Sequence, residues 1–271
     1  MSGAVPDGGV DPDARAAVDA SIAAVAGAAD AFPGEDGAFP GDDGASRRFG
    51  GVARSYGAAG AARIAAAHAV VVGVGGVGSW VAEALARCGI GRLTLIDLDH
   101  VAESNVNRQV HALGSTLGAS KVDTMAARIA DISPSTRVDR IDEFVTVDNV
   151  AALVPAGADV VVDAIDAPRA KAALIAHCVA LGVPVVVCGA AGGRLDPLAL
   201  RRSDVADAKG DALLASVRAR LRRDHAFPRE RGARFGVDAI WSPAPAGGGR
   251  PASPGEARMP LPGAGHRSVG V

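Results

Sequence analysis

The sequence predicts an α/β fold with a doubly wound, mostly parallel sheet. Short β-branched runs alternate with segments of helical period between residues 69 and 187. The first run, residues 69–74, is continuously apolar, as expected of a strand buried on both faces of a parallel sheet. A glycine-rich turn follows it and opens a helix, which is the order of a nucleotide-binding βαβ unit. These three observations together predict the fold class.

The elements are expected in a regular order along the chain. The helix from residue 121 should end at Ser133-Pro134, because a residue before proline avoids the helical region. After Gly193 the pattern changes, and we expect the late strands to be antiparallel additions to the sheet. We predict strands at 69–74, 93–96, 137–141, 159–163, 183–187, 198–201 and 235–241, and helices at 58–67, 77–87, 121–132, 168–181 and 212–223.

Composition divides the 271-residue chain into three parts. Residues 1–45 carry nine acids and one base, and we expect a disordered, acidic, low-complexity arm. Such a segment buries too little apolar surface to offset the entropy of ordering. Residues 242–271 are rich in proline and glycine and are expected to be a disordered tail. The folded, ligand-binding domain is therefore predicted at 46–241.

Charge and cysteine usage exclude several classes of protein. A net charge of −2 excludes a globally basic nucleic-acid binder, although residues 194–234 hold eleven bases and six acids. That segment is either a solvated surface or a surface for a polyanion such as RNA. Cys88, Cys178 and Cys188 show no C-x-x-C spacing, which argues against a four-cysteine zinc site and fits a reducing cytoplasm. No apolar run is long enough to predict a transmembrane helix.

A phosphate-binding turn is predicted directly after the first strand. Gly73-Val74-Gly75-Gly76-Val77-Gly78 is a G-x-G-x-x-G motif, whose Gly73, Gly75, Gly76 and Gly78 permit a tight turn and a close backbone approach to a phosphate. Asp97 ends the second strand, where an acid can hold ribose hydroxyls. On these features alone, an NAD(P) oxidoreductase would be the leading interpretation.

Polar residues in the long loop 99–120, and just after it, favour a different chemistry. Asn105, Arg108 and Lys121 follow the ribose acid, and a hydride-transfer enzyme has no need of them. An adenylating enzyme must screen a triphosphate and stabilise charge that develops on the leaving pyrophosphate, for which Arg108 and Lys121 are suited.

Two further acids end the strand expected at 159–163. Asp163 and Asp166 lie at the carboxyl edge of the sheet, where ligands bind in folds of this kind. A carboxylate there can hold Mg²⁺ beside phosphates. We predict Asp166 as the metal ligand, while Asp163 is equally suited to organise the turn.

The motifs together resemble a known superfamily. Gly-x-Gly-Gly-x-Gly at 73–78, Asp-x-Asp-x-Val at 97–101, Ser-Asn-x-Asn-Arg-Gln at 104–109, Gly-x-x-Lys at 118–121 and Asp-Ala-x-Asp at 163–166 resemble the ThiF/MoeB adenylating enzymes, relatives of ubiquitin-activating enzyme. Segments 48–57, 78–91, 107–112 and 191–193 are similar, more narrowly, to the tRNA threonylcarbamoyladenosine dehydratases. The resemblance covers about 47–241 and implies a Rossmann-like sheet.

The resemblance also implies an activity and its site. ATP would activate the carboxylate of threonylcarbamoyladenosine at position 37 of certain tRNAs, and ring closure would then expel AMP. The implied partners are ATP, Mg²⁺, a tRNA substrate, a second subunit in a homodimer and sulfur-transfer proteins of a cysteine desulfurase system. The implied site comprises Gly73, Gly75, Gly76, Gly78, Asp97, Asp99, Asn105, Arg108 and Lys121 for ATP, Asp166 for Mg²⁺, and Arg54 (or Arg48) reaching the partner subunit's ATP.

One departure from the family concerns a cysteine. Members carry Gly-Val-Asp-Cys near the C-terminus, whereas Ala239 occupies the cysteine position here. A thioester or persulfide role of that residue is therefore absent or unnecessary. The alternative function is an activator of a sulfur-carrier or ubiquitin-like protein, which normally needs a nucleophilic cysteine and often zinc-binding cysteine pairs after the core. The sequence lacks such pairs.

Overall fold

The computed structural model describes residues 45–194 and 196–243. The predictions for the acidic arm and the C-terminal tail lie outside these residues, apart from their innermost positions. A single seven-stranded sheet runs through the domain in the order β3-β2-β1-β4-β5-β7-β6, and only the β6–β7 pair is antiparallel. The strands are β1 (His68–Val72), β2 (Arg92–Ile96), β3 (Arg137–Ile141), β4 (Val160–Asp163), β5 (Val185–Cys188), β6 (Arg201–Asp204) and β7 (Asp238–Trp241).

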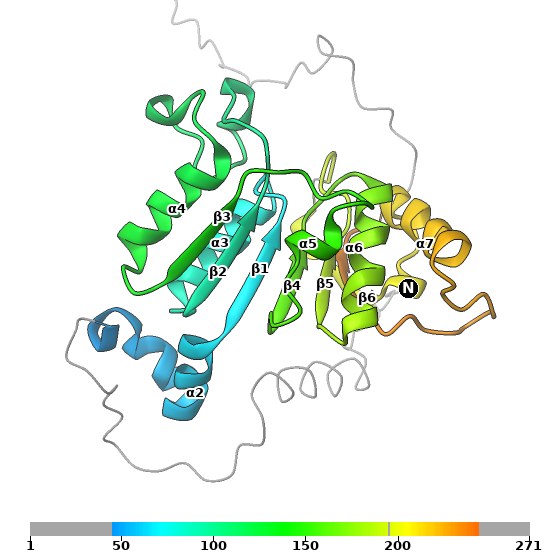
Figure 1. The fold of residues 1–271 in the computed structure, drawn as a ribbon, viewed down its shortest axis with the longest axis horizontal. Helices are drawn as coiled ribbons and strands as arrows, with labels where there is room; N and C mark the ends of the chain where they lie inside the picture. The colour runs from blue at the N-terminus through cyan, green and yellow to red at the C-terminus, as the bar shows by residue number, and fades with distance from the viewer. Residues whose placement is uncertain (1–44, 195, 244–271) are drawn as a thin grey trace, which may run out of the picture.

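Helices cover the sheet and its amino end (Figure 1). They are α2 (Ala45–Ala66), α3 (Gly78–Arg87), α4 (Lys121–Ile132), α5 (Val150–Leu153), α6 (Pro168–Leu181) and α7 (Ala212–Asp224). The predicted bounds of α4 and α6 are confirmed. The helix predicted at 58–67 is the second half of α2, which is longer and kinked at Gly57 (φ 72°). The short helix α5 was not predicted.

The late strands differ in two ways from the prediction, although the fold class is confirmed. The predicted strand at 198–201 is wrong over its first residues, because Asp196 accepts a hydrogen bond from the Leu198 amide (2.9 Å) and starts a 3-10 turn, Pro197–Ala199. β6 begins only at Arg201. The strand predicted at 235–241 begins at Asp238, since the amides before it donate to the Asp204 carboxylate. Of the two late strands, β6 is the antiparallel one.

The direction in which successive strands are added to the sheet reverses between the parallel neighbours β1 and β4. β1 leads to β2 and β3 on one side, and the connection from β3 then crosses to β4 on the other side. In the register of the sheet, Val72 is paired with Ile96 and with Asp163. The residues that follow these three positions therefore emerge together at the carboxyl edge, the topological switch point at which ligands bind in open α/β sheets.

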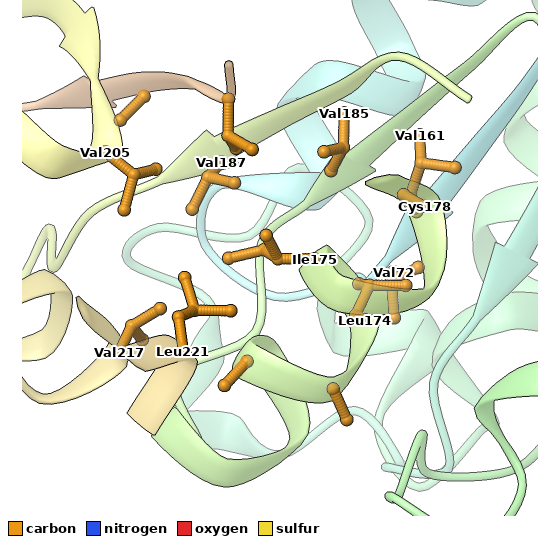
Figure 2. Close-up of a cluster of buried hydrophobic side chains, with 14 of the residues drawn as sticks. Val72, Val161, Leu174, Ile175, Cys178, Val185, Val187, Val205, Val217 and Leu221 are labelled. Carbon is orange, nitrogen blue, oxygen red and sulfur yellow. The ribbon is translucent and has the colours of Figure 1, made fainter. Parts of the chain in front are cut away.

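The core has one apolar layer on each face of the sheet. On one face, Leu93 and Leu95 of β2 share a core cluster with Met125 and Ile129 of α4 and with the alanines of α3. On the other face, side chains of α6 and α7 meet the valines of the central strands (Figure 2). α2 lies at the foot of β1, at the end opposite the carboxyl edge (Figure 1). Within the described ranges, every helix falls short of the length and apolar character that a bilayer span needs.

Candidate active site

A cavity of about 990 Å³ opens at the carboxyl edge, over the ends of β1, β2, β4 and β5. The structure thus brings most of the predicted site residues together. Those in its lining are Gly73, Gly75, Gly76, Asp97, Asp99, Asn105, Arg108, Lys121 and Asp166. Residues that sequence reasoning did not assign to the site also line it, among them Gln109, Glu143, Phe144, Cys188, Gly189, Ala190 and Leu213.

The glycine turn needs glycine for different reasons at different positions. A Cβ on Gly78 would lie 1.8 Å from the carbonyl oxygen of Gly73, so Gly78 packs the start of α3 against the turn instead of lining the cavity. Gly73 itself has φ 86°, a region that disfavours side chains. A Cβ on Gly75 would meet no atom within 4 Å, so the backbone there is open to a ligand. The prediction of a close phosphate approach therefore fits Gly75 best.

Asp97 ties the end of β2 to this turn. Its Oδ2 accepts a hydrogen bond from the Val74 amide (2.6 Å), and its Oδ1 accepts one from the Asp99 amide (2.8 Å). The side chain is buried at the floor of the cavity. Each carboxylate oxygen retains a further lone pair, so Asp97 can still accept a hydrogen bond from a ligand hydroxyl.

Arg108 is held above the glycine turn by its own loop. Its Nη1 donates to the Ser104 carbonyl (2.7 Å) and to Asn107 Oδ1 (2.9 Å). The Trp80 indole, exposed on α3, donates to the Arg108 carbonyl (3.0 Å) and anchors the backbone of this residue. The aliphatic part of Arg108 lies 3.4 Å from where a Cβ on Gly76 would be. A cation is therefore positioned directly beside the turn.

Lys121 supplies a second cation from the first residue of α4. Its side chain is only 6% exposed, and Nζ donates to Asp99 Oδ2 at 2.7 Å. His111, which is fully buried nearby, has no hydrogen-bond partner on either ring nitrogen among the described residues. Burial, together with the charges of Lys121 and Arg128, lowers the pKa of His111 to about 4. The imidazole is therefore neutral at physiological pH and adds no charge to the site.

The two acids after β4 have different surroundings. Asp163 is completely buried and pairs with Lys171 of α6, whose Nζ lies 2.7 Å from Asp163 Oδ1. The same oxygen accepts from the Ile165 amide (3.1 Å), so Asp163 organises the turn. Asp166 lines the cavity and has no hydrogen-bond or ion-pair partner among the described residues. Only Asp166 is therefore available to a ligand.

The wall of the cavity at the end of β5, which we call the β5 wall (residues 189–192), was not predicted. It consists of glycine and alanine backbone and is held from behind by Asp211, which is 1% exposed. Asp211 Oδ2 accepts from the Ala190 amide, and Oδ1 accepts from the Leu214 amide at the start of α7, both at 2.9 Å. An aspartate before a helix is a recognisable N-cap signal. Its contact with Ala190, 21 residues earlier, has no local signal.

Comparison with known proteins places this geometry in a family. The model of the ThiF family matches residues 50–205. The chain belongs to the ThiF family.

This ThiF-family chain is similar to curated bacterial proteins. It is 49% identical over 176 residues to the tRNA threonylcarbamoyladenosine dehydratase of Escherichia coli (strain K12), which covers 65% of the chain and 66% of that protein. It is 44% identical over 184 residues to the dehydratase of Haemophilus influenzae, covering 68% of the chain and 70% of that protein. The match thus spans about two thirds of the length of these relatives.

A solved structure shares the fold. The crystal structure of the E. coli tRNA N6-threonylcarbamoyladenosine dehydratase in complex with ATP has a TM-score of 0.72 and 48% identity. The aligned region covers 74% of this chain and 83% of the E. coli chain. The family resemblance and the fold class predicted from the sequence are confirmed.

Burial disfavours the thiolate at two cysteines of this ThiF-family chain, Cys178 and Cys188. Only Cys188 lines the cavity, and burial raises the pKa of its thiol. Cys178 is fully buried, which raises its pKa to about 12. Ala239, at the family's cysteine position, is completely buried in β7 and is paired with Val187 of β5. A side chain at that position belongs to the core and not to the cavity lining.

The predicted N-terminal arginines lie far from the cavity lining. Arg54 is exposed on α2 at the amino end of the sheet and has no partner among the described residues. Arg48 instead caps the last turn of α4, where its Nη1 donates to the carbonyls of Asp131 (3.1 Å) and Ile132 (2.9 Å). Between the two candidates for a residue acting on a partner subunit, Arg54 is the one without a structural task in its own subunit.

Proposed function

We propose that this ThiF-family protein is an ATP-dependent tRNA threonylcarbamoyladenosine dehydratase. The observation that carries the proposal is a cavity that places Arg108 and Lys121 beside an open glycine turn and an unpaired Asp166 at the end of the neighbouring strand. This set suits a triphosphate, and the curated relatives that share almost half of the aligned residues bear this enzyme name. With a tRNA substrate, we propose that the protein acts in the cytoplasm.

In the proposed reaction, Arg108 and Lys121 stabilise negative charge on the phosphates. The substrate carboxylate attacks the α-phosphate of ATP, and pyrophosphate leaves. Arg108 and Lys121 stabilise the negative charge that develops between these phosphates, because fixed cations in a cavity need no reorganisation during the step. A nucleophilic atom of the same substrate side chain then attacks the activated carbonyl and expels AMP. The carboxylate oxygen departs with AMP, so the modified nucleoside has lost the elements of water.

We further propose Mg²⁺ as a cofactor, with Asp166 as its protein ligand. The described residues contain no cluster of three metal-binding side chains, which suits an ion that binds through one or two carboxylates, water and phosphates. Bound there, the ion would neutralise phosphate charge. Asp166→Asn should raise the Mg²⁺ concentration needed for half-maximal pyrophosphate exchange, whereas an unchanged Mg²⁺ dependence would remove Asp166 from this role.

The active unit is proposed to be a homodimer in which Arg54 completes the site of the partner. Arg54 lies at the amino end of the sheet, whereas the cavity lies at the carboxyl end, so a two-fold partner presents it more directly than its own chain. Arg54→Ala and Lys121→Ala proteins should each be nearly inactive. Mixed subunits should recover up to about a quarter of wild-type activity if they exchange randomly. Demonstrated exchange without recovery, or a fully active monomer, contradicts this arrangement.

Sulfur-transfer partner proteins remain a prediction from the resemblance. Within residues 45–194 and 196–243, the cavity offers one thiol, Cys188, and its raised pKa disfavours the thiolate. The alternative function, activation of a carrier protein, uses the same ATP chemistry with a protein carboxylate as substrate. The two functions therefore share the ATP site and differ in the carboxylate that is activated, which belongs to the tRNA nucleoside in one and to a carrier protein in the other.

The deciding experiment is nucleoside mass spectrometry of tRNA after incubation with the protein, ATP and Mg²⁺. Conversion of threonylcarbamoyladenosine to a product lighter by one water, with one AMP formed per conversion, is the expected result. AMP formation without any change in the tRNA would contradict the proposal. Pyrophosphate exchange that requires a carrier protein would support the alternative.

A further inference from the structure

We propose that the outer edge of the sheet carries a binding surface for the RNA backbone, and this inference rests on the proposed function. The surface, which we call the β6 basic surface, comprises Arg201, Arg202, Arg222, Arg229, Arg231 and Arg234. Five of these side chains are exposed, and Arg222 is half-buried. They lie outside the cavity lining described above.

The surface is continuous with the rim of the cavity. β6 is the last strand of the sheet and is antiparallel to β7, with Arg201 paired with Trp241. In β7, Ile240 pairs with Cys188 at the cavity end of β5, so Arg201 lies at the carboxyl edge where the cavity opens. From there β6 runs about 10 Å towards the amino edge.

Contacts of Asp204 and Arg222 hold together the part of the surface that is far from the cavity. At the end of β6, the Asp204 carboxylate holds the amides of residues 235–237, directly after Arg234. The Arg222 guanidinium lies 5.1 Å above the Phe235 ring, and Arg229 donates to the Arg222 carbonyl (3.1 Å). The end of β6, the end of α7 and the segment around Arg229 and Arg234 are therefore held together, with Arg231 between the last two in sequence.

The segment 194–234 keeps a basic excess at its surface, where seven bases and four acids are exposed. Two of its six acids, Asp204 and Asp211, are buried. Asp204 accepts hydrogen bonds from backbone amides, and Asp211 also pairs with the half-buried Arg194 (3.7 Å), so neither acid faces the exposed arginines. Arg201, Arg231 and Arg234 are exposed and have no side-chain partner among the described residues. A guanidinium that is free of carboxylates presents its fork of donors to phosphate oxygens.

Ordinary structural roles explain only part of this surface. Charged residues protect an edge strand from pairing with other chains, which accounts for Arg201 and Arg202. Cations at the C-terminus of a helix stabilise its dipole, which accounts for Arg222. Neither reason applies to Arg231 and Arg234, which lie beyond α7 and outside any strand. A polyanion that runs from the cavity rim along β6 towards the amino edge accounts for all of them, and the proposed substrate is a polyanion.

The test is a pair of triple variants that change the net charge equally. Arg201→Ala/Arg231→Ala/Arg234→Ala removes three cations from the β6 basic surface. The control, Arg63→Ala/Arg137→Ala/Arg140→Ala, removes three exposed cations from α2 and from β3, the opposite edge of the same sheet. The dissociation constant for tRNA carrying threonylcarbamoyladenosine is measured from about 50 to about 200 mM salt. Over this range the affinity falls with salt in proportion to the number of phosphate contacts. ATP affinity is measured by calorimetry.

The first variant should bind this tRNA at least about tenfold more weakly at the lower salt concentration. Its salt dependence should also be shallower, by about 0.7 to 0.9 in log–log slope for each lost phosphate contact. The control should stay within about twofold of the wild type, and ATP affinity should be unchanged in both. Equal losses in the two variants, or no loss in the first, overturn the surface proposal.

Two further readouts separate failures of different kinds. If the wild-type protein converts tRNA normally and the first variant matches it, only the surface proposal fails. If the wild-type protein neither binds nor converts this tRNA, the proposed function fails together with the surface. A change in solution mass of the first variant, seen by light scattering, would identify the surface as a protein interface and overturn its assignment to RNA.

Discussion

The two sides of the cavity are built differently. On the side of the glycine turn and the loop 99–120, which we call the phosphate side after the proposed triphosphate, charged side chains line the cavity. On the β5 side, the wall is glycine and alanine backbone whose position depends on Asp211, a residue from a later helix start. The comparison teaches that one side supplies charge and the other supplies shape.

The largest effect is expected from removing charge on the phosphate side. Lys121→Ala should lower turnover about 10²-fold or more, because losing one charge-stabilising donor typically costs about 3 kcal/mol in the transition state. The pair Lys121–Asp99 is broken by this change, but Asp99 is half exposed and can be solvated. Steady-state kinetics on tRNA, with a circular dichroism spectrum as the control for folding, provide the measurement. Near-normal turnover would show that the phosphates bind elsewhere.

This contrast also explains what could be predicted from the sequence. The bounds of α4 and α6 and the residues from Gly73 to Lys121 were predictable, because caps, prolines, glycine spacing and charge are local signals. The β5 wall was not, since glycine and alanine carry no chemical signal, and the N-cap pattern at Asp211 does not reveal its second contact with Ala190. The start of β7 was misjudged because Asp204 takes the amides of residues 235–237 from 31 or more positions away. The error at 198–200 has a local cause, the turn that Asp196 starts.

A second prediction concerns the layer beneath the phosphate side. The pKa of His111 in the folded protein is about 4, compared with 6.5 for the exposed group. As the pH falls from 6.5 towards 4, His111 becomes protonated in the unfolded chain but stays neutral in the folded protein. The free energy of unfolding therefore decreases over this pH range. The full contribution is about 3 kcal/mol, of which about 2 kcal/mol is lost by pH 5.

The variant His111→Leu should lack this dependence. Neither ring nitrogen has a partner among the described residues, so leucine forfeits no hydrogen bond there. Chemical unfolding at pH 7.5 and pH 5 should show a drop in stability that is smaller in the variant by about 2 kcal/mol. An equal drop in both proteins would mean that the imidazole is already solvated or paired in the folded state.

A third prediction compares two buried aspartates near α7, Asp211 and Asp204. Asp211→Asn replaces one acceptor oxygen with a donor, so one of the amides of Ala190 and Leu214 loses its partner and the β5 wall loosens. We expect turnover at saturating tRNA to fall about tenfold, or roughly 1.4 kcal/mol, while ATP affinity stays within about twofold.

Asp204→Asn is the control for that variant, although Asp211 differs from Asp204 in also pairing with Arg194 (3.7 Å). Asp204 is similarly buried and also accepts several backbone amides, but the segment that it holds, residues 235–237, does not line the cavity. Its melting temperature should fall comparably, with turnover at saturating tRNA close to that of the wild type. Equal losses of turnover in both variants would show that Asp211 acts through general stability and not through the wall.

The smallest effect is expected at Cys188, the one reactive group on the β5 side. Its thiol lines the cavity, but burial raises its pKa and keeps it protonated, and a protonated thiol is a poor nucleophile. The family's cysteine position cannot compensate, because Ala239 is enclosed between β5 and β6 in the sheet. Cys188→Ala should therefore convert tRNA within about twofold of the wild-type rate, and Cys188→Ser should behave alike because its volume is similar. If both folded variants keep pyrophosphate exchange but lose ring closure more than about tenfold, a covalent thiol step operates, and the β5 side supplies chemistry as well as shape.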